Sequence, residues 1–267
     1  MTTEHDIYLT RYGLGKILAL GWEQYRKHFA SILPIFLIVY IPINVGLSFV
    51  PVEYLIEEHG LRGFRIYMKL IQLTEFLIGV VATMSLARLI EASLMGQPIT
   101  WKQALRHAVS RWAASIGTGV LAWLIVLGMF LLLIVPGIIW GLYYSLFVYV
   151  VALRRLSGKS ALDYSKSIVK GQWWRVFGYL FVIELIGACA GLAVAAPFFF
   201  TPDNRILNIT SDTLSDLVSA LFLCITTVFF LNNDRMRMKS EPDAAPNGGP
   251  AAPVGNPEIT NGSPSVS

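Results

Sequence analysis

Six apolar stretches, each near the length needed to cross a bilayer, constrain the fold of this chain more than any other feature. A membrane-spanning helix needs about 20 mostly apolar residues. The stretches cover residues 32–50, 73–90, 116–134, 138–153, 176–200 and 214–231. Because hydrophobic residues make up 55 % of the 267 residues and charged residues only 14 %, a soluble domain could not bury so much apolar surface behind so few charges. The sequence therefore predicts an all-α polytopic membrane protein with six transmembrane helices.

A tight turn is predicted between the third and fourth stretches. Only Val135, Pro136 and Gly137 separate them, and the joined run over 116–153 is too long for a single span. Pro-Gly is a strong turn signal. Pro136 and Gly137 are therefore predicted to form the turn of a helical hairpin. Applied to the whole chain, the same pattern predicts three hairpins.

Amphipathic segments precede three of the stretches and are predicted to lie in the membrane interface on the cytoplasmic side. They are the lead at 1–30, a helix opened by a capping box at Thr100 and Gln103, and residues 160–170. The predicted organisation is a cytoplasmic lead at 1–30, a six-helix domain at 31–233 and a cytoplasmic tail at 234–267. Proline, glycine and the lack of aromatic residues predict disorder from about residue 240.

The distribution of basic residues predicts the orientation of the spans. With six spans, 17 of the 21 Lys and Arg residues fall in the two terminal segments and the second and fourth connections. The other four fall in the first and fifth connections: Arg62, Arg65, Lys69 and Arg205. Basic residues concentrate on the cytoplasmic side of membranes. Both termini are therefore predicted to be cytoplasmic.

Glu184 is the clearest ionisable residue inside a predicted span. It lies nine residues after Arg175, or about 14 Å along a helix, which is near the bilayer midplane. Gly187 and Gly191 follow on the same helix face, so we expect this face to pack against another helix and Glu184 to face the bundle interior. It is then either a proton, cation or headgroup site, or a protonated acid that hydrogen-bonds to a neighbouring span. Glu75 and Asp216, near the outer ends of their spans, are expected to be solvated.

Basic and aromatic residues around the fourth connection are candidate contacts to lipid headgroups. They are Lys159, Lys166, Lys170, Arg175, Trp173 and Trp174. Each basic side chain near an anionic membrane surface contributes about 1 kcal/mol to binding. The simpler interpretation, that these charges only fix the topology, stays open.

No motif in the sequence indicates a catalytic, cofactor or metal site. The chain has no Walker loop, dinucleotide fingerprint, His-Glu-x-x-His sequence or nucleophile elbow. Its basic segments lack the soluble platform that nucleic-acid binding needs. We therefore expect no enzyme activity, no cofactor and no nucleic-acid partner, and we expect membrane lipids as partners.

Three motifs in a fixed order resemble a known family. They are Pro136-Gly137-Ile138, the sequence Ser-Ala-Leu-Asp-Tyr-Ser at 160–165, and Lys-Gly-Gln-Trp-Trp-Arg-Val-Phe-Gly at 170–178. This set resembles a family of bacterial membrane proteins named after the membrane domain of some glycerophosphoryl diester phosphodiesterases, many of whose members stand alone in the inner membrane. The match is clearest over 135–178, and its outline extends over 12–233.

The resemblance implies a membrane module without the catalytic domain that gives the family its name. A phosphodiesterase barrel takes about 250 residues, for which this chain has no room. The His-Arg pair that such barrels use is also missing, since none of the four histidines precedes an arginine.

Two functions follow from the sequence. The first is a non-enzymatic protein of the bacterial inner membrane, acting as an accessory module in lipid or envelope homeostasis. The alternative is a small transporter or permease that uses Glu184 inside the helix bundle. A polar cavity that reaches Glu184 favours transport, whereas a dry, packed environment favours the module.

Overall fold

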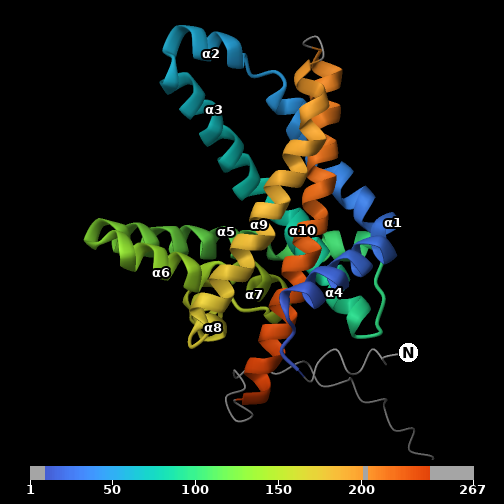
Figure 1. Cartoon of the computed structure of the whole chain (residues 1–267), viewed down its shortest axis with the longest axis vertical. Helices are drawn as coiled ribbons and strands as arrows, with labels where there is room; N and C mark the ends of the chain where they lie inside the picture. Colours follow the sequence, from blue (N-terminus) through green and yellow to red (C-terminus); the bar gives the residue numbers. More distant parts are fainter. Residues whose placement is uncertain (1–9, 201–203, 241–267) are drawn as a thin grey trace, which may run out of the picture.

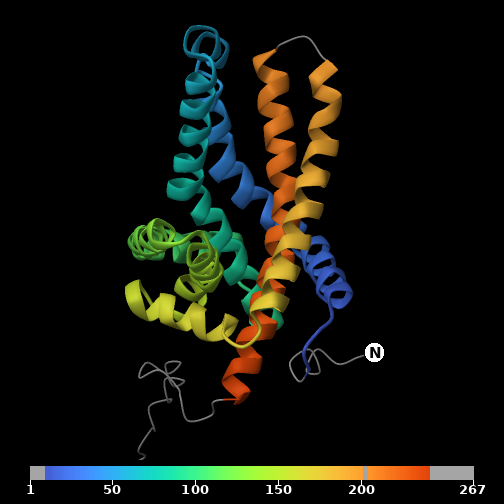
Figure 2. The same cartoon turned by 60° about the vertical axis from the view of Figure 1, so that its left-hand side comes forward.

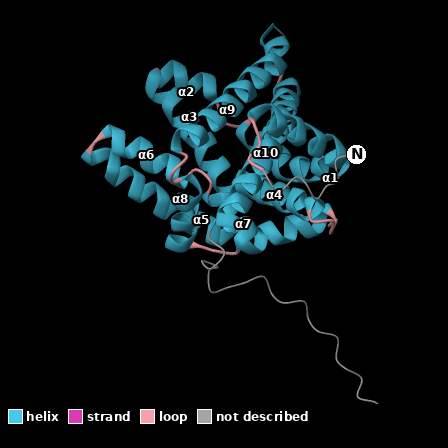
Figure 3. Cartoon of the chain, turned by 60° about the horizontal axis from the view of Figure 1, so that its bottom comes forward, coloured by secondary structure: helices cyan, strands magenta, loops and turns pink. Residues whose placement is uncertain are grey.

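The computed structural model describes residues 10–200 and 204–240, and all regular structure within these ranges is helical. In chain order the elements are α1 (Leu14–Leu47), α2 (Val52–His59), α3 (Leu61–Thr74), the π-helix η2 (Glu75–Gly79), α4 (Val80–Leu94), α5 (Trp101–Leu132), α6 (Ile134–Tyr144), α7 (Phe147–Arg154), α8 (Gly158–Val169), α9 (Trp173–Ala195), the 3-10 helix η3 (Ala196–Phe200) and α10 (Arg205–Ser240). Short loops join the helices (Figure 3). The predicted all-α class is confirmed for the described part of the chain. The predicted disordered tail lies almost wholly outside it, from residue 241 onward.

Six segments are long and apolar enough to cross a membrane, which confirms the predicted number. Helices α1, α5 and α10 each form one of these segments. A fourth segment consists of α9 and the start of η3, as far as Phe198. The other two are composite. The segments α3, η2 and α4 follow one another as Leu61–Leu94, and α6 and α7 together form Ile134–Arg154.

The six segments do not share one direction. Helices α9 and α10 run side by side along the long axis of the molecule (Figures 1 and 2), and α1 packs more extensively on α10 than on any other element. Helices α5 and α6 lie across this direction: they extend sideways in Figure 1 and appear nearly end-on in Figure 2. Helices α5 and α6 pack on each other, and this pair is not parallel to the α9–α10 pair.

Three predicted boundaries fall inside continuous helices. The capping box is confirmed, because the Thr100 hydroxyl accepts the Gln103 N–H at 3.3 Å and the Gln103 side chain accepts the Thr100 N–H at 2.9 Å. Helix α5 then continues unbroken to Leu132, since no proline separates its amphipathic half from its apolar half. Likewise α1 crosses residues 30–31 and α10 crosses residues 233–234, so neither predicted domain boundary is a break in the fold.

The turn between α5 and α6 lies at Leu133, so the predicted position at Pro136 and Gly137 was wrong. Leu133 is extended, with φ −160° and ψ 145°. Pro136 instead occupies the first turn of α6, where a helix does not need its N–H. Gly137 allows α6 to approach α5 closely, because a Cβ atom there would lie 2.4 Å from the Phe130 ring.

Helix α10 is central to the core and α9 is peripheral. Half of the most apolar window of α10 is buried, against 6 % for α9. Gly21 of α1 lets α10 approach, since a Cβ atom at Gly21 would meet the Ile225 backbone at 2.7 Å. Phe229 and Phe230 of α10 are fully buried, and Tyr149 of α7 stacks on Phe230 with ring centroids 5.5 Å apart.

Candidate functional site

An ion-pair network joins four helices where the apolar part of the bundle ends near the two described termini; we call it the inner network. Arg154, at the end of α7, contacts Glu91 of α4 at 2.6 Å. Its Nε donates to Oδ2 of Asp234 on α10 at 2.9 Å, and its second guanidinium nitrogen contacts the same oxygen. Tyr164 of α8 donates to Oδ1 of Asp234 at 2.7 Å. Arg88 contacts Glu91 at 2.8 Å, as its spacing of three residues predicts.

The inner network is buried and its carboxylates are paired. Glu91 is 1 % exposed and Asp234 is 0 % exposed. Burial and the nearby Asp234 carboxylate raise the pKa of the Tyr164 hydroxyl to about 12, so it remains a hydrogen-bond donor at neutral pH. A buried charge is tolerated only when it is paired and hydrogen-bonded. The network therefore holds α4, α7, α8 and α10 together.

A second set of polar contacts, the outer cluster, lies toward the other ends of α1 and α10. Asn44 of α1 donates to Asp216 of α10 at 2.7 Å and to the Thr213 hydroxyl at 3.3 Å. Tyr40 of α1 donates to Glu75 at 3.4 Å. Glu75 opens the π-helix, and its carboxylate lies over Gly79, where a Cβ atom would be 2.2 Å from Oε2. The expectation that Glu75 and Asp216 are simply solvated was incomplete, because both bind α1.

The two clusters bracket the apolar length of the bundle. On α10, Asp216 and Asp234 are 18 residues apart, a rise of about 27 Å. On the composite α3–α4 segment, Glu75 and Glu91 are 16 residues apart, or about 24 Å if helical rise is uniform. Both values are close to the thickness of the hydrocarbon core of a bilayer, about 30 Å.

Glu184 lies on the exposed side of α9, so the prediction that it faces the bundle interior was wrong. The packed face of α9 runs through Ile183, which is fully buried, and Gly187, whose Cβ position would be 3.1 Å from Phe222 of α10. A Cβ atom at Gly191 would have no described atom outside its own helix turn within 4 Å. Helix α9 carries small residues on several of its faces. The glycine spacing alone therefore could not identify the face that packs on α10.

The six candidate headgroup contacts divide into two groups. Lys159, Lys170 and Trp174 are exposed, and Trp174 is 79 % exposed. The other three make intramolecular contacts. The Nζ of Lys166 lies 4.0 Å from the centroid of Trp140, Arg175 donates to the Tyr12 carbonyl at 2.7 Å, and Trp173 stacks on Phe177.

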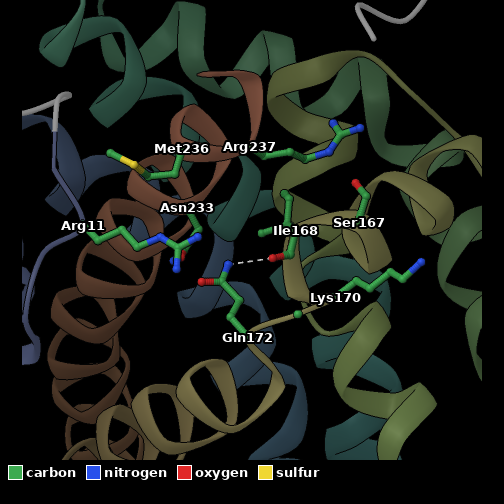
Figure 4. A pocket seen from close by; sticks show the side chains of 9 residues that line it. Arg11, Ser167, Ile168, Lys170, Gln172, Asn233, Met236 and Arg237 are labelled. Carbon is green, nitrogen blue, oxygen red and sulfur yellow. Dashed lines mark hydrogen bonds between the residues drawn. The ribbon is translucent and has the colours of Figure 1, made fainter. Parts of the chain in front are cut away.

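A polar pocket of about 570 Å³ lies beside the exposed group, between the N-terminal segment, the α8–α9 turn and the end of α10 (Figure 4). Three of its nine lining residues are basic: Arg11, Lys170 and Arg237. Two amide oxygens, Oε1 of Gln172 and Oδ1 of Asn233, are buried and have no hydrogen-bond partner among residues 10–200 and 204–240. The sequence analysis gave neither amide a role, although Gln172 belongs to the motif at 170–178.

Comparisons with protein-family models, with curated proteins and with solved structures found no match. The function must therefore be argued from the geometry.

Proposed function

We propose that this chain is a non-enzymatic, multi-pass protein of the bacterial cytoplasmic membrane that acts as an accessory module in lipid or envelope homeostasis. Its cytoplasmic face binds anionic lipid headgroups. The observation that carries the proposal is the exposure of Lys159 at the start of α8, Lys170 directly after α8 and Trp174 at the start of α9. Tryptophan and basic side chains are enriched at the headgroup level of membranes.

The two polar clusters supply the frame for this proposal. If the bilayer core occupies the space between them, the outer cluster lies at one headgroup boundary and the inner network at the other. The excess of basic residues near the inner network then assigns that side to the cytoplasm, with both termini on the same side. In this frame, Lys170 and Trp174 lie at headgroup depth.

The buried ionisable groups bind one another, which supports an accessory membrane module more than an enzyme or a transporter. In the inner network, Glu91, Arg154 and Asp234 neutralise one another. The transporter alternative requires a carboxyl inside the bundle, but Glu184 lies on the exposed side of α9. We therefore do not carry that alternative forward.

The proposal is tested in nanodiscs formed from equal amounts of phosphatidylcholine and phosphatidylglycerol. We expect mass spectrometry of the retained lipids to show enrichment of the anionic lipid, and a smaller enrichment with Lys159→Gln/Lys170→Gln. Arg62→Gln/Lys69→Gln is the matched control, because it removes two exposed charges from α3. We also expect the lipid masses to stay unchanged on incubation. If the two lipids are retained in the same proportion in which they were supplied, headgroup binding is contradicted. If a lipid is chemically altered, the non-enzymatic role is contradicted.

A further inference from the structure

The α5–α6 pair runs crosswise to the helices that bracket the bilayer core. Helices α9 and α10 follow the long axis of the molecule, whereas α5 and α6 extend sideways from it in Figure 1 and appear nearly end-on in Figure 2. On α10, Asp216 and Asp234 are separated by a rise of about 27 Å, close to the thickness of the hydrocarbon core. In the proposed orientation α10 therefore crosses the bilayer, and α5 and α6 lie close to the membrane plane.

The part of this pair that projects from the bundle is apolar and exposed. We call residues 116–144, the apolar part of α5 together with α6, the arm. The chain has no Asp, Glu, Lys, Arg or His between residues 112 and 153. All five side chains at the tip, residues 131–135, are exposed, and exposed apolar side chains continue along α5 at Val120 and Leu127. A continuous apolar surface of this kind requires a cover other than water.

Helix α8 sets the level of the arm relative to the lipid headgroups. It packs on both α5 and α6, and Figures 1 and 2 show it below them, on the side where α10 ends. Lys159 and Asp163 of α8 are exposed, whereas Leu162 is buried against Ala122 and Tyr144 of the arm. A helix with one charged face lies in the membrane interface. Packed helices have axes about 8–10 Å apart, and half of the hydrocarbon core is about 15 Å thick. The arm therefore fits within the cytoplasmic half.

Hydrogen bonds tie α8 to the base of the arm. The Thr118 hydroxyl accepts the N–H of Gly158, the first residue of α8, at 2.7 Å. The Ser165 hydroxyl donates to the Tyr143 carbonyl at 2.7 Å. Polar groups at membrane depth must find their partners within the protein, and these bonds supply such partners. Helix α8 therefore keeps a fixed depth relative to the arm.

We infer that the arm is re-entrant: it lies in the cytoplasmic leaflet, is covered by the acyl chains of that leaflet and does not cross the bilayer. The arm then holds α8, and with it Lys159 and Lys170, at the level of the headgroups. Acyl chains are the cover that fits, because the arm offers no charge to a polar partner and its helical backbone satisfies its own hydrogen bonds. The inference deepens the proposed function and rests on it for the orientation of α9 and α10.

The test compares the depths of two matched pairs of positions in the full chain, reconstituted in phosphatidylcholine vesicles. Each pair is eleven residues apart on one helix, and all four side chains are exposed: Val120 with Leu131 on α5, and Phe181 with Leu192 on α9. Eleven residues make about three helical turns and a rise of about 16 Å. Both positions of a pair therefore lie on the same helix face, and replacing these exposed side chains leaves the packed core intact.

Each position is replaced in turn by cysteine and labelled with a fluorophore. The background is Cys189→Ala, because Cys189 is exposed and the other cysteine, Cys224, is buried. Lipids that carry a nitroxide either near the headgroup or near the end of the acyl chain quench the fluorophore and report its depth. We expect the α9 pair to differ in depth by about 16 Å and the α5 pair to show a difference close to zero.

The possible results separate the arm from the proposed function. An equal depth difference on α5 and α9 overturns the inference, because α5 then crosses the bilayer. Labels on α5 that neither nitroxide quenches also overturn it, because protein then covers the arm. If Lys159→Gln/Lys170→Gln still lowers the enrichment of anionic lipid in either case, the proposed function stands alone. An arm at constant depth without lipid enrichment supports the inference and refutes headgroup binding. No depth difference on α9 refutes the orientation that both proposals share.

The tip of the arm gives an independent measurement in sealed vesicles of the same Cys189→Ala background. We expect Leu133→Cys to react with a membrane-impermeant maleimide from neither side. Glu58→Cys and Lys159→Cys are the controls, since both positions are exposed and should react from opposite sides. Reaction of Leu133→Cys from the side that labels Glu58→Cys shows that the arm crosses. Reaction from the side that labels Lys159→Cys shows that the tip lies in water. Either result overturns the inference.

Discussion

Removing Arg154 should destabilise the protein more than removing any other single charge of the inner network. Its guanidinium is the contact that Glu91 and Asp234 share, and these side chains are 2 % and 0 % exposed. In Arg154→Ala, Asp234 keeps the Tyr164 hydroxyl and Glu91 keeps Arg88, but both lose their shared guanidinium. Loss of one partner of a buried ion pair costs about 3–5 kcal/mol. Because two carboxylates are affected, we expect the free energy of unfolding to fall by an amount near the upper end of that range.

The measurement is unfolding in mixed micelles, followed by tryptophan fluorescence as the fraction of denaturing detergent is raised. Arg88→Ala is the control, because its side chain is 33 % exposed and its pair spans one helical turn. Such partly exposed pairs contribute less than about 1 kcal/mol. If Arg154→Ala costs no more than Arg88→Ala, the network does not hold the bundle together and the reasoning is refuted.

A neutral replacement of the network separates the cost of an unpaired charge from the value of the ion pair. We expect Glu91→Leu/Arg154→Met/Asp234→Leu, combined with Tyr164→Phe to avoid a stranded hydroxyl, to be more stable than Arg154→Ala. A combined variant that is less stable than Arg154→Ala would show that the network contributes more than charge compensation.

Three further predictions concern topology, helix approach and pH. Reporter fusions at Glu58 and after Ser240 should lie on opposite sides of the membrane. If both reporters lie on the same side, the proposed orientation is contradicted. Gly137→Ala should destabilise the α5–α6 pair by about 1–3 kcal/mol because of the clash with α5, whereas Gly141→Ala, with its nearest neighbour at 3.9 Å, should be tolerated in the same unfolding assay. The raised pKa of Tyr164, about 12 against an ordinary 10.0, means that the unfolded chain loses this proton first, so stability should fall as pH rises from 10 toward 12, and a pH series should show a shallower fall for Tyr164→Phe.

The sequence predicted what depends on composition and missed what depends on packing direction. Six apolar segments and the capping box at Thr100 follow from local spacing, and the structure contains them. The partners of Arg154 were missed because Glu91 and Asp234 are 63 and 80 residues away. No local pattern encodes a contact of that range.

The exposure of Glu184 and the turn at Leu133 show the same limit in two other ways. Which face of α9 packs is decided by Phe222 on α10, a residue outside its own helix. The turn at Leu133 carries no glycine or proline. Pro136 fits in the first turn of α6 because backbone N–H groups there have no intrahelical acceptor, so the missing N–H costs nothing. Gly137 fits because it allows close contact with Phe130.

The crosswise α5–α6 hairpin has a consequence for how the chain inserts. The tip around Leu133 carries no ionisable residue from Met129 to Ile138. A pair of helices that enters and leaves on the same side of the membrane does not change the side on which the next span begins. The charge asymmetry is therefore the same whether this pair crosses the bilayer or is re-entrant from the cytoplasmic side. The other four spans keep their orientation in both cases, so only the tip, five residues of which are 66–81 % exposed and all apolar, reports which leaflet the hairpin reaches.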